Sequence, residues 1–475
     1  MILNKEQRRT QISSSHRLIE MTKKIRHRLS IEEVHGKDFE YIDRDYFCNW
    51  IIPELQYKFN TSISKRQTAL LRRIRDKKSN YGVNRLTAYE YAAEALFDSH
   101  FFKNNNKYVT PEYTVDLIKK SIEHKDKIYL VMPILSRKPI SPIKNKGYFP
   151  DLGEINTLLR FAKIAKIISN ISNFECEFLV LADGNKYNRA CGTPKNIVDN
   201  YQMSLNYWIN ALNISDIVKI CDYEEWVLEN KENNFIDKRE SMYISIYNSL
   251  SRKFDSMFCC NDLNSTLGKI NQVSDLGNQI NYTYWSILTS VHYDSLYGKI
   301  NYKDIYHNRE IQNLYISFIS SLSEPISRIR SSHLFSYENI GEKASYASSL
   351  VKEMRFEAWQ AAKKYVAISL TDRKLNTIYA KLPAALKLTI HGKKNEFNFI
   401  SSTQKDFSRT AQHTVGGIRK IKGDICIDYK YRLERECGNE KKVYISPSYI
   451  KKDDNFDPLH EMSLLRQPIY YLSNE

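Results

Sequence analysis

Long apolar runs are missing from this chain of 475 residues. No stretch approaches the roughly 18 consecutive apolar residues that a membrane-spanning helix needs. Residues 1–9 also lack the apolar core of a signal peptide. We therefore expect a soluble, cytoplasmic protein that has no membrane partner.

Several sequence motifs are missing as well. The eight cysteines include no Cys-x-x-Cys pair and have no histidines at metal-ligand spacing, so neither a structural zinc site nor a redox motif is expected. The sequence contains no Walker loop, no Gly-x-Gly-x-x-Gly, no Gly-x-Ser-x-Gly and no His-Glu-x-x-His. These absences remove most of the support for ATPases, classical dehydrogenases, α/β-hydrolases and zinc proteases.

Positive charge is in excess, with a net charge of +16 at pH 7. The densest basic run, residues 65–78, places Leu70, Leu71 and Ile74 at helical spacing between its lysines and arginines. This pattern predicts a helix with a solvated basic face. Because no helix-turn-helix, zinc finger or stacking motif accompanies it, nucleic acid is not an expected partner. A non-enzymatic protein that binds nucleic acid or an acidic partner through this run stays open as an alternative.

Apolar periodicity divides the chain into four regions. Residues 1–125 form a helical amino-terminal region without assigned chemistry, and residues 126–226 form a Rossmann-like α/β core. A helical segment at 227–365 follows, and strands at 366–475 complete the catalytic domain. The predicted fold class is α/β, with a Rossmann-like, mostly parallel sheet, flanking helices, a helical amino-terminal region and a helical insertion.

The α/β core is predicted from three consecutive elements. Residues 128–135 are a continuous apolar run, which is typical of a strand buried on both faces. A helix runs from Asp151 to about residue 170, and a second buried strand covers 177–183. This order predicts a right-handed parallel βαβ unit. The other predicted helices are 86–102, 114–124, 203–212, 223–228 and 348–365, and the other predicted strands are 385–391, 396–401 and 424–431, with turns at 416–417 and 422–423.

Charged residues cluster where the loops of this core are expected to converge, beyond the carboxyl ends of the strands. The loop after the first strand contains four cations: Arg137, Lys138, Lys144 and Lys146. Cations beside a helix N-terminus suit a phosphorylated ligand. Asp151 and Glu154 open the next helix, and Asp183 ends the second strand. These carboxylates fit substrate binding, but they equally fit an N-cap with its acidic partner and an Asp-Gly turn.

A second group of polar residues belongs to the carboxyl-terminal strands. Lys387, Thr389 and His391 alternate along a predicted strand, so that they project from one face. Thr410 and His413 follow in the next segment. Two histidines near one sheet edge favour general acid/base chemistry, with solvated histidines as the alternative. No third ligand has suitable spacing, so a metal site is not expected.

Two sets of segments occur in an order known from one protein family. The first set is MPILSRK at 132–138, FPDLGE at 149–154 and ADG at 182–184, and the second is KLTIH at 387–391 and TAQH at 410–413. In these segments the chain resembles the pyoverdine/dityrosine biosynthesis family, whose best-known bacterial members are isonitrile synthases. KLTIH resembles the family's Arg-x-Ser-Ile-His strand, and TAQH stands where the family has Thr-Pro-Trp-His. The resemblance covers about residues 128–226 and 366–420.

The resemblance implies an enzyme of secondary metabolism, a transferase or lyase. It would convert the amino group of an L-amino acid to an isonitrile, with ribulose 5-phosphate as the carbon donor and no metal or redox cofactor. An iron/2-oxoglutarate oxygenase is the downstream partner that the family implies. The altered TAQH segment keeps a second interpretation open, a diverged member that performs another amine modification such as N-formylation.

The implied reaction assigns roles to the candidate residues. Forming an imine from an amine and a ketone, and then cleaving a carbon–carbon bond, requires proton transfer, for which Asp183, His391 and His413 are the candidates. Lys138 is a further catalytic candidate, as an electrophilic or Schiff-base lysine. Lys387 is the candidate for binding the amino-acid carboxylate. The other substrate-binding candidates are Arg137, Lys144, Asp151, Glu154, Thr389 and Thr410.

Overall fold

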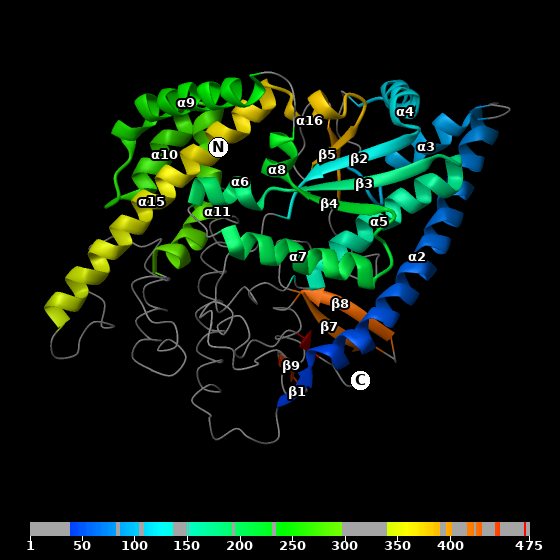
Figure 1. The fold of residues 1–475 in the computed structure, drawn as a ribbon, viewed down its shortest axis with the longest axis horizontal. Coiled ribbons are helices and arrows are strands. Elements are labelled where there is room, and N and C mark those ends of the chain that lie inside the picture. The colour runs from blue at the N-terminus through cyan, green and yellow to red at the C-terminus, as the bar shows by residue number, and fades with distance from the viewer. Residues whose placement is uncertain are drawn as a thin grey trace.

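A five-stranded parallel sheet lies at the centre of the computed structural model (Figure 1). The strand order is β4-β3-β2-β5-β6. The strands are β2 (Lys127–Pro133), β3 (Glu175–Ala182), β4 (Val218–Asp222), β5 (Leu386–Thr389) and β6 (Phe397–Asn398). The structure describes residues 39–81, 86–103, 109–135, 150, 152–191, 195–229, 234–296, 340–389, 396–400, 416–421, 424–429, 442–446 and 470–471.

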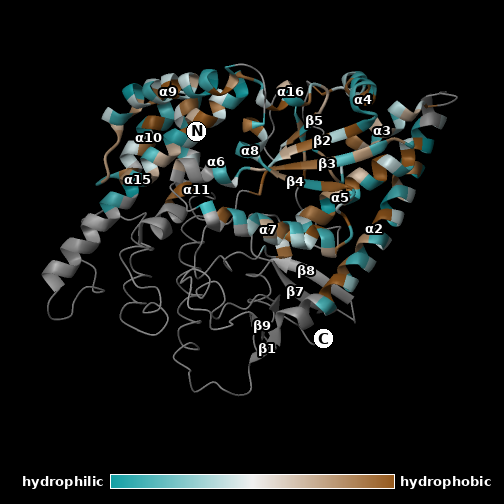
Figure 2. Ribbon diagram, viewed as in Figure 1, coloured by the Kyte–Doolittle hydropathy of each residue, from teal (hydrophilic) through white to brown (hydrophobic). Residues whose placement is uncertain are grey.

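Both faces of the sheet are buried. On one face, Leu130 and Phe178 belong to the main core, which they share with α5 (Leu152–Ser172). On the other face, Val131 and Leu181 pack with residues of α8 (Tyr223–Leu228) and α16 (Thr377–Lys381). Hydrophobic residues accordingly dominate β3, whereas α9 alternates hydrophilic and hydrophobic residues (Figure 2). Burial on both faces explains why the predicted strands are continuous apolar runs.

Helices connect the parallel strands. α5 joins β2 to β3, and its Phe161 stacks on Phe178 of β3 with ring centroids 4.0 Å apart. α6 (Gly184–Cys191) and α7 (Lys195–Ala211) join β3 to β4. The predicted α/β class is confirmed by this parallel sheet with flanking helices.

Among the described residues, three helices precede the sheet, namely α2 (Arg44–Tyr81), α3 (Ala88–Leu96) and α4 (Pro111–Lys125). The helix predicted to extend to residue 102 ends earlier, at Leu96. The cause is Asp98, whose carboxylate accepts a hydrogen bond from the backbone N–H of His100 at 2.9 Å and so stabilises a turn. After this turn, Phe102 forms a β-bridge with Phe399.

The helical insertion lies between β4 and β5. Its described members after α8 are α9 (Phe235–Phe254), the 3-10 helix η1 (Asp255–Met257), α10 (Leu263–Val273), α11 (Asp275–Leu296) and α15 (Ile340–Lys374). Trp359 of α15 stacks on Phe258 with ring centroids 4.5 Å apart. The hydroxyl of Tyr247 on α9 donates to Gln360 of α15 at 2.7 Å. These contacts hold α9 and α15 together across more than 100 residues of sequence.

Three further local predictions are wrong. β4 lies in a region predicted to be helical, because it is a short strand in which Lys219 is exposed and which pairs, among the described strands, with β3 alone. α7 begins at Lys195, earlier than the predicted start at 203. Residues 416–417, predicted as a turn, lie in β7 (Gly416–Ile421) because they pair with β8 (Asp424–Tyr429) in a separate antiparallel sheet.

A third sheet joins segments from the two ends of the chain. In it β1 (Phe39–Asp43) is parallel to β9 (Lys442–Ser446), and β10 (Tyr470–Tyr471) is antiparallel to β9. The four predicted regions stay predictions, and α15 crosses the predicted boundary at 365 without interruption. Within the described ranges, no helix has the length and apolar character needed to cross a membrane.

The basic run at 65–78 belongs to α2. Leu70 and Ile74 are 1% and 2% exposed, which confirms the predicted apolar face. Lys65, Arg72 and Arg75 are exposed to solvent. Arg66, Arg73 and Lys77 contact the carboxylates of Glu94 in α3 and of Asp98 just after it.

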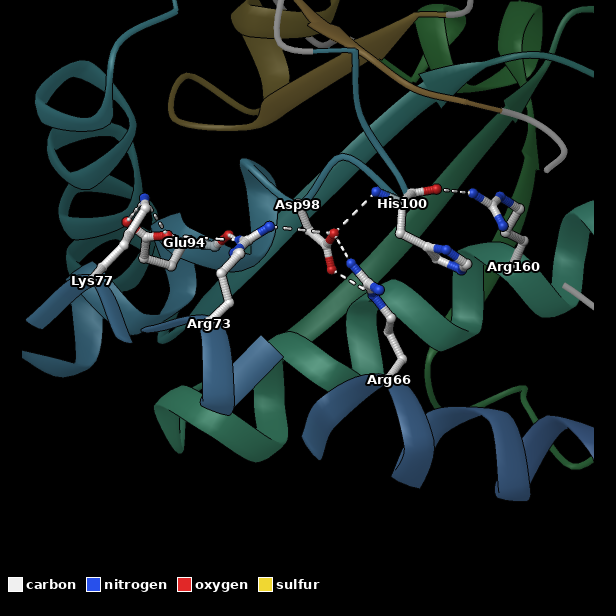
Figure 3. Close-up of polar contacts among 7 residues, drawn as sticks. All are labelled: Arg66, Arg73, Lys77, Glu94, Asp98, His100 and Arg160. Carbon is white, nitrogen blue, oxygen red and sulfur yellow. Dashed lines mark hydrogen bonds and ion pairs between the residues drawn. The ribbon is translucent and has the colours of Figure 1, made fainter. Parts of the chain in front are cut away.

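Asp98 is the centre of an ion-pair cluster that docks α2 on α3 (Figure 3). Its carboxylate is fully buried and accepts two hydrogen bonds from Arg66, one of them from Nε at 2.8 Å. Arg73 lies 3.5 Å from the same carboxylate. Lys77 contacts Glu94 at 2.9 Å in a more exposed pair. Part of the basic run therefore serves internal packing.

Arg160 of α5 ties the same region to the far edge of the sheet. It is 3% exposed and donates to the backbone oxygen of His100 (Figure 3) and to that of Ile400. Its guanidinium also lies over the rings of Phe101 and Phe399, at 5.0 and 5.7 Å from their centroids. The arginine thus satisfies backbone acceptors of two segments that are distant in sequence.

We expect Asp98→Asn to lower the free energy of unfolding by about 3 kcal/mol, because the substitution leaves Arg66 without its buried counter-ion. Glu94→Gln is the matched control, and its cost is at most about 1 kcal/mol because Lys77 is largely exposed. Urea denaturation of both variants measures the difference. Equal losses in the two variants would contradict the central role of Asp98.

Candidate active site

The carboxyl ends of the strands meet at one edge of the sheet. Pro133 of β2 pairs with Leu181, and Ala182 of β3 pairs with Asp222 at the end of β4. The chain passes from β2 to β3 and β4 on one side, whereas β5 and β6 lie on the other side. The order therefore reverses between β2 and β5, and a crevice at such a switch point is the usual ligand site in this kind of sheet.

Several predicted site residues follow directly after β2 and β5. They lie outside the described residues, together with the predicted residues of the later segments: Arg137, Lys138, Lys144, Lys146, Asp151, His391, Thr410 and His413. Their roles stay predictions. The structure places the four others, which are Glu154, Asp183, Lys387 and Thr389.

Asp183 follows the last residue of β3 and precedes α6. The hydroxyl of Tyr365 on α15 donates a long hydrogen bond to its Oδ2, at 3.5 Å. Burial raises the pKa of Asp183, and the charge of Asp222 acts in the same direction. Lys186, a backbone N–H and Tyr365 act against this rise. The carboxyl thus binds a proton more readily than an exposed aspartate does.

Glu154 lies in the first turn of α5 and is 2% exposed. Its Oε1 accepts a hydrogen bond of 2.6 Å from the hydroxyl of Tyr201 on α7. Burial, then the charge and hydrogen bond of Glu154 and the charge of Asp183, raise the pKa of Tyr201 well above its ordinary value. Tyr201 therefore stays protonated and donates a hydrogen bond to Glu154. Sequence reasoning found Glu154 but not this partner.

Asp222 is a site residue that sequence reasoning missed. It caps α8 by accepting hydrogen bonds from the backbone N–H groups of Glu224 and Glu225, at 2.9 and 3.0 Å. Its other oxygen accepts from the side-chain amides of Asn185 and Gln202, at 2.9 and 2.8 Å. It went unnoticed because β4 was not predicted, although an aspartate before a helix start is a known capping signal.

A chain of alternating charges lies beside Asp183. Lys186 of α6 contacts Asp372 of α15 at 3.1 Å, and Arg239 of α9 contacts the other oxygen of Asp372 at 2.8 Å. Arg239 also forms two hydrogen bonds of 2.8 Å with Glu224. Burial acts to raise the pKa of Asp372, but Lys186 and Arg239 outweigh it and hold the pKa below its ordinary value. These partners are far apart in sequence, so no local pattern predicted them.

Lys387 and Thr389 share one face of β5, as predicted from the alternation. The ammonium of Lys387 contacts Glu396 at 2.8 Å, and it therefore already has a carboxylate partner. Thr389 is 8% exposed, and its backbone oxygen accepts a hydrogen bond from Phe399 at 2.7 Å. The proposed contact of Lys387 with a substrate carboxylate stays a prediction.

Three of the described residues at this edge are carboxylates, namely Glu154, Asp183 and Asp222, and their hydrogen bonds come from neutral side chains and backbone N–H groups. Asp372 and Glu224 bind Lys186 and Arg239 instead. Carboxylates of the first kind suit a ligand with a positive charge, such as an ammonium group. Among the residues with described positions, no group of three or more His, Cys, Asp or Glu side chains could hold a metal ion.

We expect Asp222→Ala to lower the free energy of unfolding by about 2–3 kcal/mol, because the cap of α8 contributes about 1 kcal/mol and two amides lose a charged acceptor. Asp262→Ala is the control, since Asp262 caps α10 through one hydrogen bond only. Its loss should be about 1 kcal/mol. Chemical denaturation compares the two, and a loss for Asp222→Ala no larger than the control would contradict its bridging role.

Comparisons with known proteins give three findings. No curated protein matches the sequence. The crystal structure of the PvcA protein from Pseudomonas aeruginosa is similar, with 13% sequence identity and a TM-score of 0.41, over 74% of this chain and 94% of that chain. A family model described as pyoverdine/dityrosine biosynthesis protein matches residues 118–401, which confirms the resemblance found in the sequence. Because the match spans more than half of the chain, this protein belongs to the pyoverdine/dityrosine biosynthesis family.

Proposed function

We propose that this protein is an enzyme that converts the amino group of an L-amino acid to an isonitrile, with ribulose 5-phosphate as the carbon donor. The observation that carries the proposal is the partly buried Asp183 carboxyl, with its raised pKa, at the carboxyl edge of the sheet in a chain of this family. An amine attacks a ketone only after it has lost a proton. A carboxyl with a raised pKa is suited to accept that proton.

The distribution of charge supports the two substrates. The amino group would bind at the acidic side of the edge, near Asp183 and the Glu154–Tyr201 pair. The phosphate would bind the cations of the segment after β2, namely Arg137, Lys138 and Lys144. The reacting amine and ketone would then meet at the switch point between β2 and β5, where His391 follows β5. Condensation forms a C=N bond and releases water, and later carbon–carbon cleavage needs further proton transfers.

Incubation of the full chain with ribulose 5-phosphate and a mixture of L-amino acids tests this function. We expect an isonitrile, detected as a tetrazine adduct by mass spectrometry, and the adduct mass identifies the amino acid. Omission of ribulose 5-phosphate is the control and should abolish the adduct. A formamide product, which has one more water than the isonitrile and does not react with tetrazine, would instead establish another amine modification and overturn the isonitrile assignment.

We expect Asp183→Asn to lower kcat by roughly 10²–10⁴-fold, because the amide cannot accept the proton of the amine. In the unaltered enzyme, kcat/KM should fall as the pH decreases through the raised pKa of Asp183, since protonation removes the base. Asp216→Asn is the control, because Asp216 is exposed and precedes β4 at the opposite edge of the sheet. Unchanged turnover in a folded Asp183→Asn protein would refute the role of Asp183.

A further inference from the structure

One helix of the insertion contacts both Asp183 and the cation next to it. α15 packs against α6, and its Tyr365 and Asp372 lie seven residues apart, which is about two helical turns and therefore the same face. Tyr365 reaches Asp183 at 3.5 Å, and Asp372 reaches Lys186 at 3.1 Å. α15 is thus in a position to control both members of the Asp183–Lys186 pair.

Lys186 has little freedom to move. It is the third residue of α6, on the first helical turn after Asp183, and it is 8% exposed. Its ammonium lies over the ring of Tyr223 at 4.8 Å from the centroid and near the ring of Tyr365 at 6.0 Å. Two aromatic faces and the Asp372 carboxylate therefore surround the charge on several sides.

Asp372 is fixed in turn by Arg239 of α9. The contact is 2.8 Å long, and Arg239 also binds Glu224 of α8 through two hydrogen bonds. The acidic and hydrogen-bonding partners outweigh burial and raise the pKa of Arg239, so that the guanidinium stays charged. Asp372 consequently remains ionised between two cations. Its carboxylate, which Arg239 fixes, in turn fixes the ammonium of Lys186.

We propose that Lys186 is a positioning residue, whose ammonium favours the ionised, proton-accepting form of the neighbouring Asp183 carboxyl, and that Asp372 of α15 limits this effect by holding the ammonium in place. In its catalytic consequence this inference rests on the proposed function. Burial and Asp222 drive Asp183 towards its neutral form, and Lys186 is the largest influence in the opposite direction. The helical insertion thereby influences the charge state of Asp183 at the carboxyl edge of the sheet.

Other charged and titratable groups also face this pair. Those from the described elements are Tyr201 of α7, which bonds to Glu154 of α5, Asp222 of β4, Tyr223 and Glu224 of α8, Arg239 of α9, and Tyr365 and Asp372 of α15. The substitutions of Lys186 and Asp372 leave Tyr365 and Asp222, which also act on Asp183, unchanged in sequence. A change in the titration of Asp183 therefore reports on Lys186.

The test is a titration of the full chain labelled with ¹³C at the aspartate carboxyls. The Asp183 resonance is assigned by its loss in Asp183→Asn. Lys186→Met removes the cation, so we expect the titration midpoint of Asp183 to move to higher pH. Asp372→Asn removes a negative charge and frees Lys186 to approach Asp183, so the midpoint should move to lower pH. A loss of packing in the two variants would give no reason for the titration midpoint of Asp183 to move in opposite directions.

Lys195→Met is the matched control, because Lys195 is 60% exposed on α7 and its loss should leave the midpoint unchanged. If Lys186→Met does not fold, Lys186→Gln replaces it, with the same expectation. Shifts in the same direction, or no shift, would overturn the proposal. If the midpoints move as expected but the pH profile of kcat/KM does not follow them, the effect of Lys186 on the titration of Asp183 is established. The assignment of Asp183 as the catalytic base then fails.

Discussion

The pairing of β2 with β3 on one side and β5 on the other determines the rest of this structure. β2 is the middle strand, and all its pairings are parallel, so the carboxyl ends of the strands must point the same way. A parallel pair needs a helical crossover, which places helices on both faces and buries the strands completely. The switch between β2 and β5 follows from the strand order, and with it the position of the candidate site.

Charge at the carboxyl edge is tolerated because almost every group has a partner. A buried ion is costly unless a counter-ion and hydrogen bonds compensate for lost hydration. Asp372 lies between Lys186 and Arg239, and Asp222 accepts four hydrogen bonds from four donors. Asp183 is less completely compensated, which is why burial can raise its pKa. The site thus combines a rigid ionic frame with one carboxyl whose proton affinity is adjustable.

The same principle explains the amino-terminal basic run. In sequence it is a strip of positive charge, and its isolated pattern cannot distinguish a solvated face from a docking face. In the structure the buried carboxylate of Asp98 binds Arg66 and Arg73, and Leu70 and Ile74 of the same run enter the core. Asp98 also ends α3, so that one side chain both stops a helix and anchors its neighbour.

The sequence by itself determined the elements whose burial is complete. β2, β3 and α5 were predicted because a strand covered on both faces must be apolar throughout, and a buried helix repeats apolar residues at its own period. Asp183 and Glu154 followed, since they stand at the ends of these elements. Only the tertiary structure decided the partners of these carboxylates. β4 is a half-exposed edge strand without a distinctive pattern, and Arg239 meets Asp372 across 133 residues. Contacts between such distant segments depend on how the helices pack, and packing leaves no periodic signal in either segment alone.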